Sequence, residues 1–383
     1  MTYSSYRVKV PGKLLIAGEY AVLEPNQQAI VIAVNRYLTA KIEPSVRNEL
    51  SLPQLGLNHV TWKIADQDIQ FNVSDPRLQF IRNSIAVVNQ FLQEKSVSLR
   101  PIYLSVKSDL DDADTGQKYG LGSSAAIVVA VISAMLSLYN EGKEQATLEE
   151  IFKLAVIAHL KTQKNGSGAD IAAAVFGGWL VYSSFQPYWL VNKLQQGIKL
   201  NMLVEMPWPN LSITPLRAPS LLNLCVGWTG EAASTGPLVK KVQQFRKGNL
   251  KVYNEFLKEN SIAVNQLIQS IKVDDYWGAS SSLAESRKAL KKLSEDASIT
   301  IETAKLKELS EIANNYGSGK SAGAGGGDCG IAFVKEESHI PELYKAWQNA
   351  GIMPLNIAVS KNGVTVTEYT CEMSLNEYLA SCV

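Results

Sequence analysis

Two glycine-rich segments of the chain could bring backbone N–H groups close to a bound anion. The first consists of Gly120, Leu121, Gly122, Ser123, Ser124, Ala125 and Ala126. Glycine permits positive φ and close approach of the backbone, and a helix that begins after the loop attracts negative charge at its N-terminus. The two serines add hydroxyls for phosphate oxygens or Mg²⁺. The loop therefore predicts an anion site, with a tight turn capped by serine as the structural alternative.

The second glycine-rich segment runs from Ser321 to Gly330 and reads SAGAGGGDCG. So many glycines cannot pack a core, and they suit a place where the backbone approaches a ligand or another surface closely. A flexible linker is the alternative, but the helix expected before the segment and the strand expected after it would hold both ends. Residues 317–321 end like a P-loop, but the first glycine of that motif would fall at Asn314, so the motif is excluded.

Composition excludes several classes of function. The net charge of +1, from 37 basic and 36 acidic residues, gives no global field that would recruit nucleic acid. The longest nearly apolar run, Ala125–Leu136, is shorter than the roughly 20 residues of a membrane span. The N-terminus lacks the apolar region of a secretory signal. We therefore expect a cytoplasmic protein with no nucleic-acid or membrane partner.

The residues that most often bind metals or form nucleophilic triads are sparse. The four cysteines form no C-x-x-C pair, so a zinc site is not indicated. The three histidines lie far apart in the sequence, and no G-x-S-x-G nucleophile elbow accompanies them. The acidic cluster Asp109–Asp114 resembles a calcium loop, but its fifth and twelfth positions are Ala113 and Gly120, so we interpret it as a solvated loop.

The elements that must position the glycine-rich loops mix strands and helices. Alternating or β-branched stretches predict strands at Arg7–Val10, Val31–Ala40, Ile102–Ser108, Trp179–Ser183, Leu221–Trp228, Gly330–Val334, Ile357–Val359 and Val364–Tyr369. Helical length and capping signals predict helices at Ser123–Asn140, from Thr147 to about Lys164, near Asp170, and at Asn249–Ile271, Tyr276–Leu293, Ile301–Asn315 and Ile340–Gln348. The first strand is expected to end at Pro11-Gly12. We predict an α+β protein of two domains, residues 1–215 and 216–383.

Three segments together resemble one family, the GHMP kinases. They are Pro11–Tyr20, which is similar to the family's first motif, Gly120–Ala126, similar to its phosphate loop, and Ser321–Gly330, similar to its third motif. Each alone is weak evidence, but the ordered set spans nearly the whole chain. The resemblance implies an N-terminal domain like domain 2 of ribosomal protein S5 and a ferredoxin-like C-terminal domain. It also implies that ATP and the phosphoryl acceptor bind between them.

Within the family, the chain resembles the bacterial branch that acts on mevalonate 5-phosphate. Gly18-Glu19-Tyr20 replaces a common Gly-Glu-His, and Val226–Thr229 and Gly325–Gly330 are also similar to that branch. The resemblance implies that the γ-phosphoryl group of ATP is transferred, with Mg²⁺, to the 5-phosphate. The products would be mevalonate 5-diphosphate and ADP, on the mevalonate route to isopentenyl diphosphate. We expect a monomer or a homodimer.

The resemblance also implies roles for individual residues. Asp170 matches an aspartate near the acceptor oxygen, although an aspartate at a helix start is by default a cap. Lys13 matches a lysine that reaches the transferring phosphoryl group, with an exposed lysine at a strand end as the alternative. The loop residues Gly120 to Ala125 would hold the nucleotide, and Ser124 would meet Mg²⁺.

The chemistry of a phosphate acceptor adds further candidates. A phosphate monoester is largely dianionic at pH 7, so it needs cations that offset repulsion from ATP more than it needs a base. Lys118, close before the phosphate loop, is therefore a third catalytic candidate, and Arg287 could grip the acceptor phosphate with two hydrogen bonds. The other acceptor-side candidates are Tyr20, Ser234, Thr235, Ser321, Gly323, Ala324 and Gly325.

One position departs from the mevalonate kinases of the family. They carry a glutamate for Mg²⁺ eleven residues before the catalytic aspartate, where this chain has His159, a poor ligand for that ion. Water and Ser124, or another acid, would then complete the metal site, and His159 would pack or cap locally. The alternatives are a mevalonate kinase or another kinase of the family, the related decarboxylase, and a non-catalytic regulator that binds a metabolite. The intact Lys13, Ser124 and Asp170 argue against the regulator.

Overall fold

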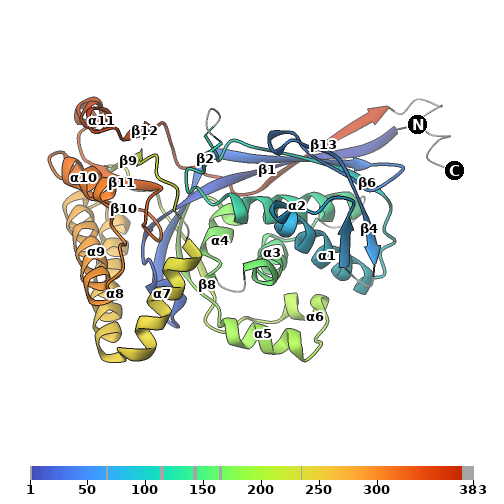
Figure 1. The fold of residues 1–383 in the computed structure, drawn as a ribbon, viewed down its shortest axis with the longest axis horizontal. Helices are drawn as coiled ribbons and strands as arrows, with labels where there is room; N and C mark the ends of the chain where they lie inside the picture. The colour runs from blue at the N-terminus through green and yellow to red at the C-terminus, as the bar shows by residue number, and fades with distance from the viewer. Residues whose placement is uncertain are drawn as a thin grey trace.

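The computed structural model describes residues 2–65, 68–112, 116–140, 145–163, 166–233 and 235–372. Within these residues the strands form two sheets, one of nine strands and one of four. Figure 1 shows the two sheets on opposite sides of the molecule, each with its own set of helices. This arrangement confirms the predicted α+β class.

The larger sheet is built around two long antiparallel strands, β1 (Thr2–Ala17) and β2 (Gln28–Pro44). The remaining strands of this half are β3 (Glu49–Leu52), β4 (Leu57–Ala65), β5 (Asp68–Phe71), β6 (Ile102–Ser108), β7 (Trp179–Ser183) and β8 (Ser212–Leu216). The order is β1-β2-β6-β3-β4-β5, and β7 pairs with both β2 and β8. The predicted bounds of β6 and β7 are confirmed.

The first strand does not end at Pro11-Gly12, as the sequence predicted, but continues to Ala17. Its register against β2 shifts between these two residues, and such a bulge accommodates a proline that has no N–H to donate. A Cβ at Gly12 would lie 2.7 Å from Leu110 Cδ2 and 2.9 Å from the carbonyl oxygen of Leu121. Glycine thus lets β1 pass close to the first glycine-rich loop.

Four helices lie on one side of the larger sheet, three of them against its strands and the fourth, α3, packed on the other helices (Figure 1). They are α1 (Gln79–Glu94), α2 (Ser123–Tyr139), α3 (Leu148–Gln163) and α4 (Ala169–Phe176). α2 is buried on nearly all sides, as its apolar sequence predicts. The predicted capping box opens α3, because the Glu150 amide donates to Thr147 Oγ1 (3.1 Å) and the Thr147 amide donates to Glu150 Oε2 (2.9 Å).

The smaller sheet is antiparallel and has the order β10-β11-β9-β12. Its strands are β9 (Asn223–Trp228), β10 (Gly317–Ser321), β11 (Cys329–Val334) and β12 (Met353–Leu355). Its helices are α7 (Thr235–Gly248), α8 (Leu250–Lys272), α9 (Tyr276–Asp296), α10 (Ala304–Ala313) and α11 (Ile340–Asn349). Two further helices, α5 (Pro187–Gln195) and α6 (Leu200–Glu205), follow β7 and precede β8 along the chain. Among the described helices, none is long and apolar enough to cross a membrane.

The last described strand, β13 (Thr365–Glu372), returns to the larger sheet and pairs antiparallel with β1. A domain boundary after residue 215 stays a prediction, but the chain beyond residue 364 contributes its strand to the sheet of the N-terminal half. The predicted strand at Ile357–Val359 is wrong, because the segment forms only one isolated bridge, between Val359 and Val34.

Candidate active site

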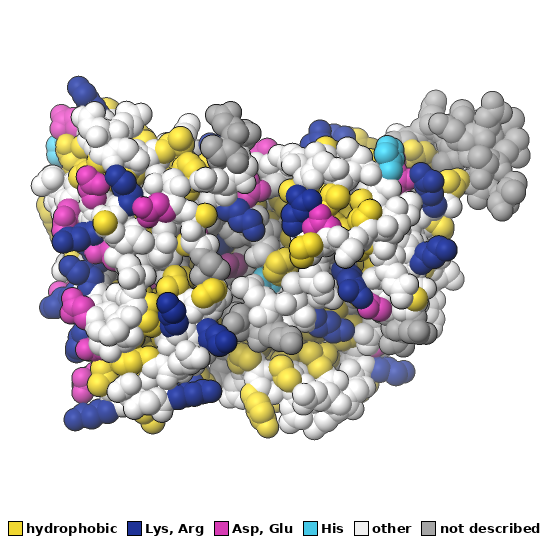
Figure 2. Space-filling view, viewed as in Figure 1, with side chains coloured by type: hydrophobic (Ala, Val, Ile, Leu, Met, Phe, Trp, Pro, Cys, Tyr) yellow, Lys and Arg dark blue, Asp and Glu magenta, His cyan; other side chains and the backbone are white. Residues whose placement is uncertain are grey.

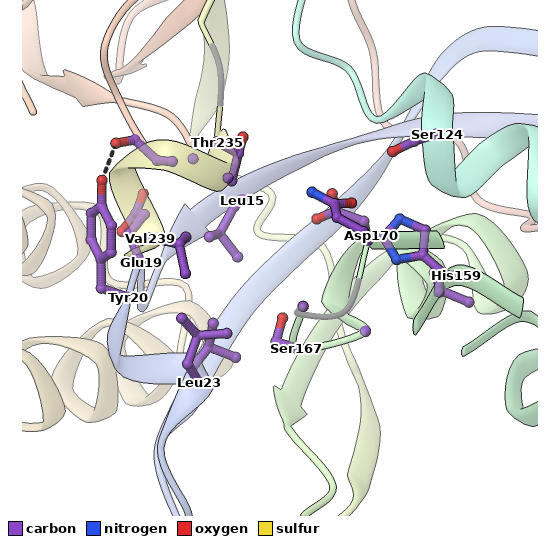
Figure 3. A pocket seen from close by; sticks show the side chains of 18 of the residues that line it. Leu15, Glu19, Tyr20, Leu23, Ser124, His159, Ser167, Asp170, Thr235 and Val239 are labelled. Carbon is purple, nitrogen blue, oxygen red and sulfur yellow. Dashed lines mark hydrogen bonds between the residues drawn. The ribbon is translucent and has the colours of Figure 1, made fainter. Parts of the chain in front are cut away.

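A pocket lies where the two halves of the molecule meet, and its wall is drawn from both (Figure 3). Seven residues predicted for the site line it, namely Lys13, Tyr20, Ser124, Asp170, Thr235, Gly323 and Ala324. Figure 2 shows the molecule's surface hollowed near this junction, with basic and acidic side chains interspersed around it. The structure therefore gathers residues from five separate stretches of sequence around one cavity.

Lys13 and Asp170 form an ion pair in this pocket. Their Nζ and Oδ2 atoms are 3.4 Å apart, and the lysine side chain is 12% exposed while the aspartate is 44% exposed. Lys13 comes from β1, whose amide at that residue donates to the carbonyl of Leu121 (2.8 Å) in the first glycine-rich loop. Asp170 lies in the first turn of α4, after Gly168 at the N-cap. Strand and helix thus present opposite charges to the same space.

The first glycine-rich loop leads into the N-terminus of α2, as predicted. Gly120 and Gly122 both have positive φ, +79° and +82°, and Gly122 is the N-cap residue. The first amides of an α-helix have no acceptor within the helix, so they are available to a ligand. A Cβ at Gly122 would lie 2.8 Å from Lys13 Cγ, which shows that the lysine side chain passes directly across this glycine. Ser124, in the first turn, lines the pocket.

The turn that carries Asp170 is held by hydrogen bonds to the carbonyl of Ser167. Tyr182 Oη and Ser184 Oγ both donate to this oxygen. Gly168 has φ of +83°, and a Cβ there would lie 2.8 Å from the hydroxyl of Tyr182. A side chain at this position would therefore displace the start of α4, and Asp170 with it.

A fully buried ion pair joins the two halves beside the pocket. Glu19 and Lys320 are both 0% exposed, and the ammonium group of Lys320 donates to Glu19 Oε1 and to the carbonyls of Ile16 (3.1 Å) and Ser321 (2.7 Å). Burial raises the pKa of Glu19, and the charge of Lys320 opposes this rise. The sequence did not predict the partner, since Lys320 belongs to the segment that was excluded as a P-loop.

Tyr20, the next residue, links the same two segments. Its φ is +59°, which is uncommon for a residue with a side chain, and its hydroxyl donates to the carbonyl of Ala324. Its ring packs in a cluster with residues of α7, α8 and α9, including Val242 and Tyr253. Burial raises the pKa of Tyr20, and the charge of Glu19 adds to this. Two adjacent side chains after β1 thus contact the other half of the molecule, Glu19 at Lys320 in β10 and Tyr20 at Ala324 in the second glycine-rich segment.

Some predicted site residues lie elsewhere or are engaged. The guanidinium of Arg287 makes two hydrogen bonds to Glu302, at 2.7 and 3.0 Å, and does not line the pocket. Lys118 is exposed, and its backbone forms an isolated antiparallel β-bridge with that of Asp111. Ser234 lies outside the described residues.

Two more predicted residues, Ser321 and Gly325, belong to the second glycine-rich segment but do not line the pocket. Ser321 is buried in β10. Gly325 packs closely against the carbonyl of Ile301.

His159 occupies the position at which the mevalonate kinases were expected to have a glutamate. It lines the pocket, and its ring lies 5.2 Å from that of Phe80. Burial lowers the pKa of His159, and the charge of Asp170 opposes this. The ring thus packs against α1 as the sequence interpretation allowed, but it also faces the pocket.

The described residues contain no group of three or more histidine, cysteine or acidic side chains that could hold a metal ion by itself. Mg²⁺ bound with a nucleotide takes most of its ligands from phosphate oxygens and water, and it uses one or two protein oxygens. Ser124 and the half-exposed Asp170 supply such oxygens in the pocket. The donor set therefore fits a magnesium ion that arrives with a polyphosphate.

Comparison with known proteins agrees with these features. Residues 82–178 match the model of the GHMP kinase N-terminal domain, and residues 279–352 match that of the C-terminal domain. A phosphomevalonate kinase from Streptomyces sp. (strain CL190) is 31% identical over 92% of this chain and 97% of the relative.

Two further proteins are similar over most of the chain. A mevalonate kinase from Thermococcus gammatolerans is 25% identical over 94% of this chain and 97% of the relative. The crystal structure of a Streptococcus pneumoniae phosphomevalonate kinase in complex with phosphomevalonate and AMPPNP superimposes with a TM-score of 0.80, at 29% identity, over 92% of this chain and 99% of that one. With the three motifs brought together around one pocket, these relationships show that the chain is a kinase and belongs to the GHMP kinase family.

Proposed function

We propose that this kinase transfers the γ-phosphoryl group of ATP to the phosphate of mevalonate 5-phosphate, giving mevalonate 5-diphosphate and ADP. The observation that carries the proposal is the Lys13–Asp170 pair, which lies in the pocket beside the N-terminus of α2. The named activities of the Streptomyces and pneumococcal relatives support the choice of acceptor. A cytoplasmic location and a monomeric or homodimeric state belong to the same proposal.

The geometry suits the transfer between two anions. The amides at the start of α2 and the hydroxyl of Ser124 would hold the β- and γ-phosphates of ATP. Mg²⁺, held by Ser124 and Asp170, would offset phosphate charge. Lys13 passes over Gly122 toward Asp170, so its ammonium group is placed to stabilise the charge of the transferring phosphoryl group.

The acceptor reaches the pocket with its nucleophile already formed. At neutral pH a phosphate monoester oxygen attacks the γ-phosphorus as an anion, the bond from the γ-phosphorus to the bridging oxygen breaks, and ADP leaves with that electron pair. No proton has to be removed from the acceptor. Asp170 would then orient Lys13 and the metal, and Thr235, Gly323 and Ala324 on the opposite wall would contact the acceptor.

A mevalonate kinase is the second candidate, because the Thermococcus relative covers almost the whole chain. The histidine at position 159 favours the phosphate acceptor, since the pocket lacks a glutamate at this place. ADP release, measured with ATP and Mg²⁺ against mevalonate, mevalonate 5-phosphate and mevalonate 5-diphosphate, separates the candidates. We expect turnover with mevalonate 5-phosphate alone. Turnover with mevalonate alone, or release of carbon dioxide from the diphosphate, would contradict the proposal.

A further inference from the structure

Asp328, the acid within the second glycine-rich segment, lies directly against the phosphate loop. A Cβ at Gly120 would come within 2.6 Å of the carboxylate oxygen Oδ2 of Asp328, so the acid faces the α-carbon of the loop's first glycine. The Asp328 amide donates to the carbonyl of Glu231 (2.6 Å), and its Oδ1 accepts a hydrogen bond from the amide of Ala233 (3.0 Å). The carboxylate is therefore held in one position beside the loop.

The backbone of Asp328 lies in the left-handed region, which glycine adopts more readily than aspartate does. Asp328 has φ of +58° and follows three glycines, Gly325 to Gly327, that also have positive φ, and a glycine would adopt this conformation at lower cost. Strained residues of this kind persist where the surrounding structure enforces them, and they cluster at functional sites. What aspartate adds at this position, compared with glycine, is the acceptor for the Ala233 amide and a carboxylate beside the loop.

The electrostatic surroundings show what that purpose could be. Burial raises the pKa of Asp328, while the Ala233 amide and the charges of Lys13 and Lys118 oppose the rise and favour the ionised form. An ionised carboxylate beside a phosphate-binding loop repels a bare polyphosphate. The repulsion is much weaker when a divalent cation has already offset part of the phosphate charge.

We propose that Asp328 makes the nucleotide site select the Mg²⁺ complex of the nucleotide over the metal-free nucleotide. The proposal rests on the proposed function, because it places the nucleotide phosphates at residues 120–124. Asp328 acts through its charge at the edge of the loop and needs no direct bond to the metal. Lys13 and Lys118 lie in the same field, so the carboxylate also limits how strongly these two lysines attract an uncompensated phosphate.

The test is a calorimetric titration with ADP, once with excess Mg²⁺ and once with EDTA. The Asp328→Asn variant keeps an oxygen acceptor for the Ala233 amide and almost the same volume, but it removes the charge. We expect this variant to bind metal-free ADP about tenfold more tightly than the unchanged protein, with little change for Mg²⁺–ADP. The matched control is Glu231→Gln, which removes a neighbouring carboxylate that bonds to Thr303. It should leave both affinities unchanged.

A second variant, Asp328→Gly, removes the charge and suits the positive φ, so it guards against poor folding of the first. The proposal is overturned if both variants keep the ratio of the two affinities found in the unchanged protein, or if both forms of ADP weaken equally. If the unchanged protein binds ADP in neither condition, the proposed function itself fails. If the unchanged protein prefers Mg²⁺–ADP and both Asp328 variants keep that preference, only the role of Asp328 is overturned and the proposed function stands.

Discussion

At the scale of single residues, Lys13 connects the parts of the site. Its backbone amide bonds to the phosphate loop, its side chain crosses Gly122, and its ammonium group pairs with Asp170. Sequence reasoning identified all three residues, because their motifs lie in short, recognisable segments. It could not identify Lys320 as the partner of Glu19, since 301 positions separate them and only the folded chain brings them together.

Replacing Lys13 should cost more activity than replacing Asp170. We expect Lys13→Met to lower kcat by about 10²–10³, the usual effect of losing one donor to transition-state charge. Asp170→Asn should cost less than the roughly 10²–10⁴ that a general base contributes with an alcohol acceptor, since the phosphate acceptor needs no deprotonation. Steady-state kinetics with mevalonate 5-phosphate measure the effect of both substitutions. The same assay should show lower activity for Lys118→Met. If Asp170→Asn abolished turnover while Lys118→Met changed neither kcat nor KM, the account based on cations would be wrong.

His159 should make stability depend on pH. Burial lowers its folded-state pKa below the unfolded value of 6.5, so the unfolded chain binds the proton more readily. The stabilising contribution is therefore present above pH 6.5 and is lost as the pH falls from there toward the folded-state pKa. Urea unfolding at pH 7.5 and 5.5 should show a smaller loss of stability in His159→Gln than in the unchanged protein. An equal loss in the two proteins would refute this.

At the scale of elements, regular patterns were predicted well and tertiary effects were not. The strands β6 and β7 and the helix α2 follow from β-branched alternation and from a long apolar run. β10 reads GSGKS, which has no strand-forming residue, and it exists because β11 pairs with it and α10 packs on it. α7 begins with threonine, glycine and proline, and it was likewise not predicted.

The contact between β1 and the phosphate loop should tolerate no side chain at Gly122. In Gly122→Ala, the new Cβ would lie 2.8 Å from Lys13 Cγ and would also strain a φ of +82°. We expect loss of most nucleotide affinity and of turnover, because the lysine must move. Gly197→Ala is the matched control, since its φ is +72° with open space around the site of the Cβ. It should retain ADP affinity in the same titration, and equal damage in both variants would show that strain alone is responsible.

Removing one partner of the buried Glu19–Lys320 ion pair should lower the free energy of unfolding strongly. In Lys320→Met, the carboxylate of Glu19 stays buried without its partner, and we expect a loss of about 3–5 kcal/mol of unfolding free energy. Adding Glu19→Gln to that variant should recover part of the loss, because the buried charge is then removed. Urea unfolding of the two variants measures this. If Lys320→Met were as stable as the unchanged protein, the Glu19–Lys320 pair would not be the buried ion pair described above.

At the scale of the whole molecule, the pocket depends on two halves that the chain connects more than once. β13 pairs with β1 after the chain has completed the smaller sheet, so the N-terminal half includes the end of the described chain. The pattern of elements along the chain predicted two units, and the family resemblance implied that the ligands bind between them. They could not predict this return, because a single strand pattern does not specify which sheet it will join.

We propose that a phosphate group, and not a hydroxyl, accepts the phosphoryl group in this pocket. Phosphorus NMR of a reaction containing ATP, Mg²⁺ and mevalonate 5-phosphate tests it directly, because it reports the bond that forms. We predict that the monoester resonance of the acceptor is replaced by a pair of coupled diphosphate resonances as ADP appears. An unchanged monoester resonance, together with conversion of mevalonate to a monoester in a parallel reaction, would contradict the account.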